Sequence, residues 1–129
     1  MTVLTRAISA PDAPQPAGGY AQAVEVSGAQ RLLFVSGQIP VAADGATPKD
    51  FTSQARLAWA NVEAQLRAAG MTLDNLVKVT IFLADRAYAM ENREVRNAVL
   101  ASRTPALTVI ITGIFDPDWL IEIEAVAAD

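Results

Sequence analysis

The sequence predicts an α+β fold in which a six-stranded mixed sheet carries two helices on one face. Three observations predict it. Short segments rich in β-branched and apolar residues recur along the chain, two longer segments space their apolar residues as helices do, and turn residues separate the segments. The 129 residues fit one compact domain, residues 1–129, without linkers or repeats. The expected order is one strand, two strands, a helix, a strand, a helix and two final strands.

The N-terminal part is expected to supply three strands. The pattern from Val3 to Ile8 predicts a short strand, and a loop rich in proline and glycine follows it. Alternation then runs over residues 20–26, and residues 31–36 form the next apolar segment. Because only turn residues separate these two segments, the pattern predicts a β-hairpin between them.

The first helix has the clearer signals at both ends. Thr47-Pro48 fits an N-cap followed by proline, with Asp50 in the first turn near the positive end of the helix dipole. Apolar residues then recur at three- and four-residue spacing over 51–69. Gly70 follows as a residue typical of a helix C-terminus.

The second half of the chain alternates strands with one more helix. Residues 76–83 are β-branched and apolar, and Asp85 is the expected cap of a helix over 88–99 with a thinner apolar stripe. Residues 106–114 give the strongest strand pattern in the chain, and residues 120–126 give the last one.

The sheet face opposite the helices is predicted to be an interface. Val109 and Ile111 alternate with Thr108 and Ile110, so that both faces of this strand are largely apolar. Two short helices cover only one side of such a sheet. An exposed apolar sheet face usually marks an interface, so the sequence predicts self-association.

Composition excludes several classes of function. The formal net charge is −4, with 14 acidic and 10 basic residues and no basic cluster, which disfavours nucleic-acid binding. The chain has no cysteine and no histidine, so it has no thiolate nucleophile, no Ser-His-Asp triad and no histidine-ligated zinc. Acid–base chemistry then falls to Asp, Glu, Lys, Tyr or an ordered water. The N-terminus lacks signal-peptide features, and no apolar run approaches ~20 residues. We therefore expect a cytoplasmic protein that does not bind a membrane.

Four segments together resemble the RidA/YjgF family. They are Gly19-Tyr20 at the start of a strand, Ser-Gly-Gln-Ile-Pro at 36–40, Asn92 in the second helix, and Ile-Glu-Ile-Glu-Ala at 121–125. The resemblance spans almost the whole chain. It implies a fold like chorismate mutase of the trimeric type, a homotrimer, and a cleft between subunits for a small-molecule ligand. The family hydrolyses 2-imino or 2-enamino acids to 2-keto acids and ammonia, without a metal or organic cofactor.

The resemblance also implies site residues. Tyr20 matches a tyrosine that lines the family's pocket, and Ser36 and Gly37 match the backbone that contacts the ligand. Asn92 matches an asparagine near the cleft. Glu124, the second glutamate of its motif, matches the residue that positions the attacking water.

One key residue of the family is missing here. Pro105-Ala106-Leu107 stands where the family has Pro-Ala-Arg, and that arginine grips the substrate carboxylate; Val109 occupies a position that is often cysteine, and Gly19 replaces a usual proline. A carboxylate desolvated against Leu107 would lack a charge partner, so 2-imino acids should be poor substrates. Arg103, four positions before Leu107, is an alternative anchor only if its loop folds over the cleft.

The sequence therefore predicts hydrolytic deamination of a small imine or enamine that lacks a 2-carboxylate. A non-catalytic ligand-binding or regulatory trimer of the same fold is the alternative. The endoribonuclease label that some relatives carry suits an acidic chain without histidine poorly. Each residue also has a structural alternative: Glu124 as a solvated strand carboxylate like Glu122, Tyr20 as an aromatic packed beside Phe34, and Asn92 as a helix cap.

Overall fold

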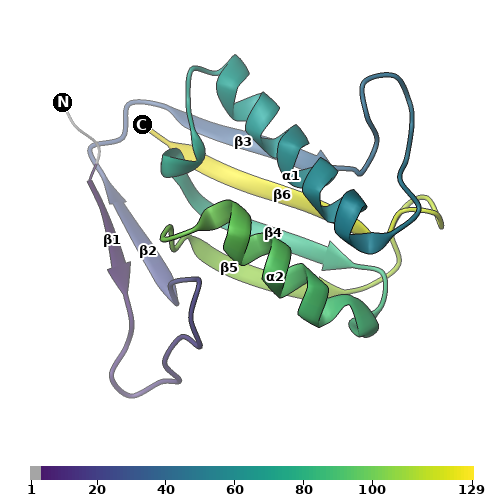
Figure 1. Cartoon of the computed structure of the whole chain (residues 1–129). Helices are drawn as coiled ribbons and strands as arrows, with labels where there is room; N and C mark the ends of the chain where they lie inside the picture. The colour runs from purple at the N-terminus through teal and green to yellow at the C-terminus, as the bar shows by residue number, and fades with distance from the viewer. Residues whose placement is uncertain (1–3) are drawn as a thin grey trace.

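The computed structural model describes residues 4–129, which form two helices, six strands and two short 3-10 turns (Figure 1). This confirms the predicted α+β class. Val3, expected in the first strand, lies outside the described residues. The elements in chain order are β1 (Leu4–Ile8), β2 (Ala23–Ser27), β3 (Leu32–Gln38), α1 (Phe51–Ala68), η1 (Leu73–Asn75), β4 (Leu76–Leu83), η2 (Arg86–Tyr88), α2 (Ala89–Leu100), β5 (Ala106–Ile111) and β6 (Ile121–Ala128).

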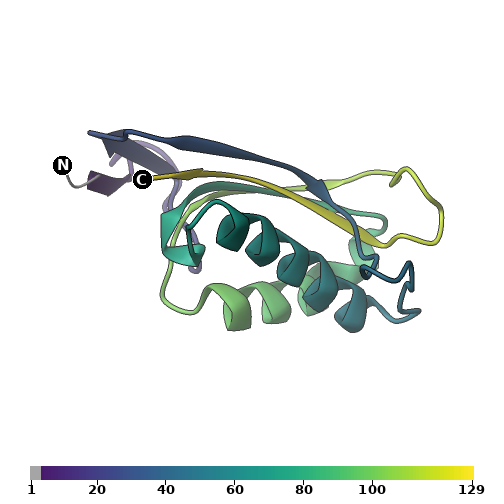
Figure 2. The ribbon, with the colours of Figure 1, turned by 90° about the horizontal axis from the view of Figure 1, so that it is seen from above.

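The strands form two sheets, so the prediction of one six-stranded sheet was wrong. Four strands pair in the order β3-β6-β4-β5, with only β4 and β5 parallel, and β1 pairs with β2 alone. Figure 2 shows that α1 and α2 lie on the same face of the four-stranded sheet, as predicted. The opposite face carries no element of residues 4–129 in this view.

The predicted hairpin between residues 20–26 and 31–36 was also wrong. β3 pairs instead with β6, at the other end of the chain. The backbone N–H groups of Gln30 and Arg31 both donate to the Asp129 carbonyl, at 2.8 and 3.0 Å, and Gly28 turns the chain with φ +73°. The residues between β2 and β3 are therefore hydrogen-bonded to the C-terminal residue, and β2 and β3 do not pair with each other.

The first helix begins three residues later than its sequence signals suggested. Asp50 is the N-cap, and its carboxylate accepts from the Ser53 backbone N–H at 2.9 Å, whereas Thr47-Pro48 lies in the preceding loop. The Pro48 carbonyl accepts from Nε2 of the buried Gln54 side chain at 2.8 Å. At the other end Gly70 has φ +74°, the left-handed conformation expected after a helix C-terminus.

The core lies between the two helices and the central strands. Alternate residues of β4 and β6 face the helices and are buried, which is the side-chain alternation of a strand with one covered face. Apolar residues on the inner side of α1 meet them. At one end of the helices the Phe51 and Tyr88 rings stack with centroids 4.8 Å apart, and Thr52 donates to Glu91 at 3.0 Å. The buried core residues of α1, β4 and β6 include Ala55, Ala58, Trp59, Val62, Leu66, Val79, Ile81, Leu83, Ile121, Ile123 and Ala127.

The β1–β2 hairpin projects from the end of the four-stranded sheet (Figure 1). Residues 5–8 of β1 are exposed, and β2 alternates between exposed and half-buried positions. The link to the main sheet runs through Ala21, which is buried and pairs with Ala106; its N–H donates to the Pro105 carbonyl at 3.1 Å. This link brings the end of the proline-rich loop to the start of β5. Neither helix of residues 4–129 is long and apolar enough to cross a bilayer.

Candidate functional site

One group of predicted site residues gathers on the open face of the sheet. Ser36 and Glu124 line the same hollow, which has a volume of about 470 Å³. Lys78 also lines it and donates from Nζ to Thr108 Oγ1 at 2.7 Å. A carboxylate and an ammonium group thus share this surface with apolar side chains. The lining residues are Phe34, Val35, Ser36, Lys78, Thr80, Glu124, Ala125 and Val126.

A β-bulge shapes the strand beside this hollow. Val35 faces Ala125 and Gln38 faces Ile123, so β3 has one more residue than β6 over this stretch. The additional residue lies at Ser36-Gly37, the segment expected to contact a ligand through its backbone. Bulges interrupt the ladder of hydrogen bonds and are common beside active sites, because they leave backbone groups free to bind other partners.

Glu122, rather than Glu124, is the carboxylate closest to Gly37. A methyl group added at Gly37 would come within 2.0 Å of Glu122 Oε2, so this carboxylate lies directly over the glycine. Both glutamates lie on the open face, because they alternate with the buried Ile121 and Ile123. Alternation along the strand does not rank the two. The available signal was the glycine itself, since a glycine inside a strand often marks the close approach of another group.

The remaining predicted residues lie on the helix side, towards β5. Leu107 is half-buried and packs against the core, and Val109 is 40% exposed at the edge of the sheet. Tyr20 lies just before the Ala21 link to β5, and its hydroxyl accepts from the Ala17 N–H at 3.2 Å. Tyr20 was expected at the start of a strand, but β2 begins only at Ala23.

Asn92 and Arg96 are the buried polar residues of α2. Asn92 is 3% exposed and Arg96 is 6% exposed. Within residues 4–129, Asn92 Oδ1 and Arg96 Nε have no hydrogen-bond partner. Arg96 Nη2 donates to Asn97 Oδ1 at 3.2 Å, and none of the ion pairs of residues 4–129 involves Arg96. Burial lowers the pKa of Arg96, the nearby Arg93 lowers it further, and Tyr20 opposes both.

Sequence reasoning missed Arg96. The signal was its position: Asn92, Arg96 and Leu100 recur every four residues, on the stripe of α2 that should face the core. A charged residue there is an exception that asks for a partner.

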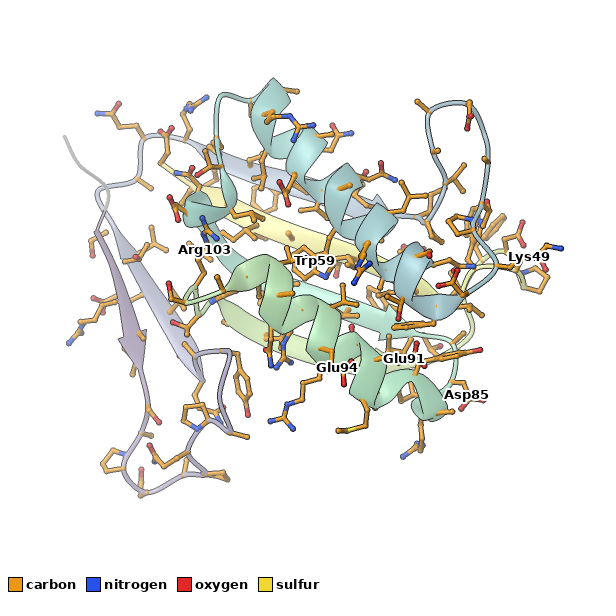
Figure 3. The ribbon with its side chains drawn as sticks, viewed as in Figure 1. Lys49, Trp59, Asp85, Glu91, Glu94 and Arg103 are labelled. Atoms are coloured by element: carbon orange, nitrogen blue, oxygen red, sulfur yellow. The ribbon has the colours of Figure 1, made fainter. Side chains whose placement is uncertain are left out.

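Arg103 is engaged elsewhere. Its Nε donates to Asp74 Oδ1 at 2.7 Å, and its Nη1 contacts the Leu100 carbonyl at 3.5 Å. In Figure 3 Arg103 lies beside η1, at the end of the sheet near the hairpin. This pairing does not favour Arg103 as a replacement for the missing arginine at 107.

A single chain keeps the two groups of predicted residues apart. Ser36, Gly37 and Glu124 lie on β3 and β6, on the open face, whereas Tyr20, Asn92 and Leu107 lie towards β5 on the helix side. β3 and β5 are three strand spacings apart, about 14 Å. Within residues 4–129, no cluster of three or more Asp or Glu side chains is arranged to hold a metal ion.

The fold and these residues define a small α+β protein with two helices on one face of a mixed sheet. The chain belongs to the endoribonuclease L-PSP family, the family of the RutC and Rid proteins, whose model matches residues 10–129. This confirms the family that the sequence motifs indicated.

Individual relatives agree with this assignment. A RutC family protein of Pyrococcus horikoshii is 36% identical over 120 residues, which cover 90% of this chain and 91% of that protein. The structure of YyfB, a Rid family protein of unknown function from Yersinia pestis, matches with a TM-score of 0.84 and 27% identity over 97% of this chain and 98% of that one. Escherichia coli TdcF, solved with bound serine, matches with a TM-score of 0.72 and 32% identity over 96% and 98%.

Proposed function

We propose that this protein hydrolyses a small imine or enamine that lacks a 2-carboxylate, in clefts between the subunits of a homotrimer. The observation that carries the proposal is the division of the site. The Ser36-Gly37 bulge with its two glutamates lies on the open face, and Tyr20, Asn92 and Leu107 lie near β5. A cleft that uses both groups requires a second copy of the chain.

The open face supports self-association. Leu32 and Phe34 of β3 are 59% and 72% exposed, and Ile110 of β5 is 40% exposed. Large apolar side chains gathered on one face of a sheet are costly to leave in water and usually mark an interface. Covering them with a second copy brings another chain towards the Ser36-Gly37 bulge.

The reaction requires a polarised C=N bond and a positioned water. A carboxylate on β6 accepts a proton from water as the oxygen attacks the imine carbon, and the nitrogen leaves as ammonia once it is protonated. The product is the corresponding carbonyl compound. We expected Glu124 in this role; Glu122 lies closer to the bulge and is a second candidate for it.

Leu107 supports the exclusion of 2-carboxylates. Its side chain packs against the helix-side core and offers neither charge nor hydrogen bond to a ligand. Desolvating a carboxylate beside Leu107 would cost several kcal/mol of binding free energy, whereas an apolar substituent would be accepted there. The bound serine in the Escherichia coli relative supports a small-molecule ligand for the family's fold.

The test is ammonia release from imines generated in place by an amino-acid oxidase or by an amine oxidase. Wild type should accelerate release from the amine-derived imines only. Glu122→Gln and Glu124→Gln, which remove the proton acceptor with little change in shape, identify the catalytic carboxylate, whose loss should lower the rate about a hundredfold or more. Leu107→Arg should gain activity on amino-acid-derived imines. Wild-type turnover of those imines would contradict the role given to Leu107.

A ligand-binding or regulatory trimer without catalysis is the second candidate, favoured by the loss of the family's arginine at position 107. Both glutamine variants would then match wild type, while Leu107→Arg alone would create activity. Light scattering should give the mass of a trimer, and a monomer would rule out an interfacial cleft. RNA binding should be weak at any salt concentration, since the net charge is −4.

A further inference from the structure

The buried polar pair on α2 is not explained by the packing of the chain. Asn92 and Arg96 are four residues apart, so they lie one turn apart on the same face of the helix. Each leaves one atom without a partner within residues 4–129: an acceptor on Asn92 and a donor on Arg96. Burying a polar atom without a partner costs stability, and a buried guanidinium without a carboxylate costs more.

The glycine turn before Tyr20 lies against Arg96. Gly18 and Gly19 have φ of +116° and +78°, conformations that other residues rarely adopt. A methyl group at Gly19 would come within 3.0 Å of Arg96 Nη2 and within 2.7 Å of Asn97 Oδ1. The turn therefore packs directly on the guanidinium, and only glycine permits so close an approach.

We propose that Arg96 and Asn92 form a binding site for a small ligand that carries a carboxylate remote from its reactive C=N or C=O group. The carboxylate accepts from the Arg96 guanidinium. A guanidinium presents several N–H donors in one plane and so matches a planar anion. Asn92 Oδ1 accepts from an N–H or O–H group of the same ligand. The ligand reaches the enclosed Arg96 Nε when the turn at residues 18–20 lifts.

The spacing of the two side chains argues for the remote position. Side chains four residues apart on a helix start about 5–6 Å from each other. A ligand that meets both has its anion and its N–H group several bonds apart. Leu107 on β5 meanwhile leaves the neighbourhood of its own side chain apolar. The inference rests on the proposed function only for the kind of ligand, because binding at Arg96 requires no turnover.

Two isomers test the position of the carboxylate. 4-Oxopentanoate and 2-oxopentanoate have the same atoms but different separations between the carboxylate and the ketone, which stands in for C=N. 4-Oxopentanamide removes the charge. Titration calorimetry on the full chain should give about tenfold or more tighter binding of 4-oxopentanoate than of either other compound. Equal binding of the amide, preference for 2-oxopentanoate, or no binding of any probe would overturn the proposal.

Matched variants test the residue. Arg96→Met should weaken 4-oxopentanoate binding about tenfold or more, and Arg96→Lys should retain part of it. Asn92→Leu should leave the binding of this probe unchanged, because 4-oxopentanoate has no N–H or O–H group from which Asn92 Oδ1 could accept. The control is Arg93→Met, which removes the same charge from an exposed position on the same helix. The ¹⁵Nε resonance of Arg96 should shift on binding, a signal that a purely structural role would not give.

Stability separates this site from an ordinary buried arginine. Arg96→Met should unfold at the same temperature as wild type or a higher one, because it removes a buried charge without a partner. A large drop in the unfolding temperature, or dissociation of the assembly, would mean that Arg96 serves packing or binds a carboxylate of another subunit. If the wild-type protein binds 4-oxopentanoate but releases no ammonia from any imine, the proposed function is contradicted and this inference still stands.

Discussion

The two helices treat their buried polar residues in opposite ways. On α1, Gln54 is 1% exposed and fully bonded: its Nε2 donates to the Pro48 and Asp118 carbonyls at 2.8 and 3.0 Å, and its Oε1 accepts from the Leu120 N–H at 2.8 Å. On α2, Asn92 and Arg96 are buried to nearly the same degree and leave atoms without partners.

The difference separates structural from functional polarity. A buried amide with every group bonded stabilises one arrangement of the chain, and Gln54 joins two loops to the start of α1. A buried group without a partner lowers stability, so its retention needs another explanation, such as binding. The exception on α1 is the Trp59 indole N–H, which also has no partner within residues 4–129; in Figure 3 this ring lies between the two helices.

The largest expected effect is on α1. Gln54→Leu keeps the size of the side chain but leaves two carbonyls and one N–H without their partner. We expect a loss of about 3 kcal/mol in the free energy of unfolding, measured by urea denaturation. The control is Gln65→Leu at an exposed position of the same helix, which should change stability by less than about 0.5 kcal/mol. Equal losses of stability in the two variants would show that the hydrogen bonds of Gln54 do not stabilise the fold.

The smaller effect is on α2 and has the opposite sign. Asn92→Leu replaces an amide whose oxygen has no partner by an apolar side chain of similar size. The free energy of unfolding should stay the same or rise by about 1 kcal/mol. The measurement is the same urea titration, run beside Gln54→Leu. A loss as large as that of Gln54→Leu would show that Asn92 Oδ1 has a structural partner beyond those of residues 4–129 in one chain, and the contrast between the two helices would then disappear.

Local patterns predicted the elements well because local physics decides them. Residues 76–83 were predicted as a strand and form β4 with the same limits, since β-branched residues alternate there between a covered and an open face. Asp85 was expected to cap the second helix, but it caps the short η2 turn, where its carboxylate accepts from the Ala87 N–H, and α2 begins after Tyr88.

Pairing and burial could not be predicted, because distant parts of the chain determine them. β3 leaves β2 because Asp129 binds the residues that connect them, and sequence distance gives no hint of this. Glu122 and Glu124 share a face, so only the bulge in β3 distinguishes them. The spacing of Asn92, Arg96 and Leu100 places Arg96 on the inward stripe of α2, but it does not show that the Gly19 turn, from another part of the chain, lies against the guanidinium.

The smallest expected effect is the loosening of the first turn of α1 at low pH. The Ser53 N–H donates to the Asp50 carboxylate at the start of α1 and lowers the pKa of that carboxyl below its usual value. A lowered pKa in the folded state contributes stability above the unfolded pKa of about 4, and this contribution disappears as the pH falls through the folded value. The residue before α2, Tyr88, forms no side-chain cap. Hydrogen exchange should therefore speed up below pH 4 in the first turn of α1 more than in α2. Asp50→Asn keeps a cap that does not titrate, so it should abolish the difference; if the two helices respond alike in wild type, the Asp50 cap is not what distinguishes them.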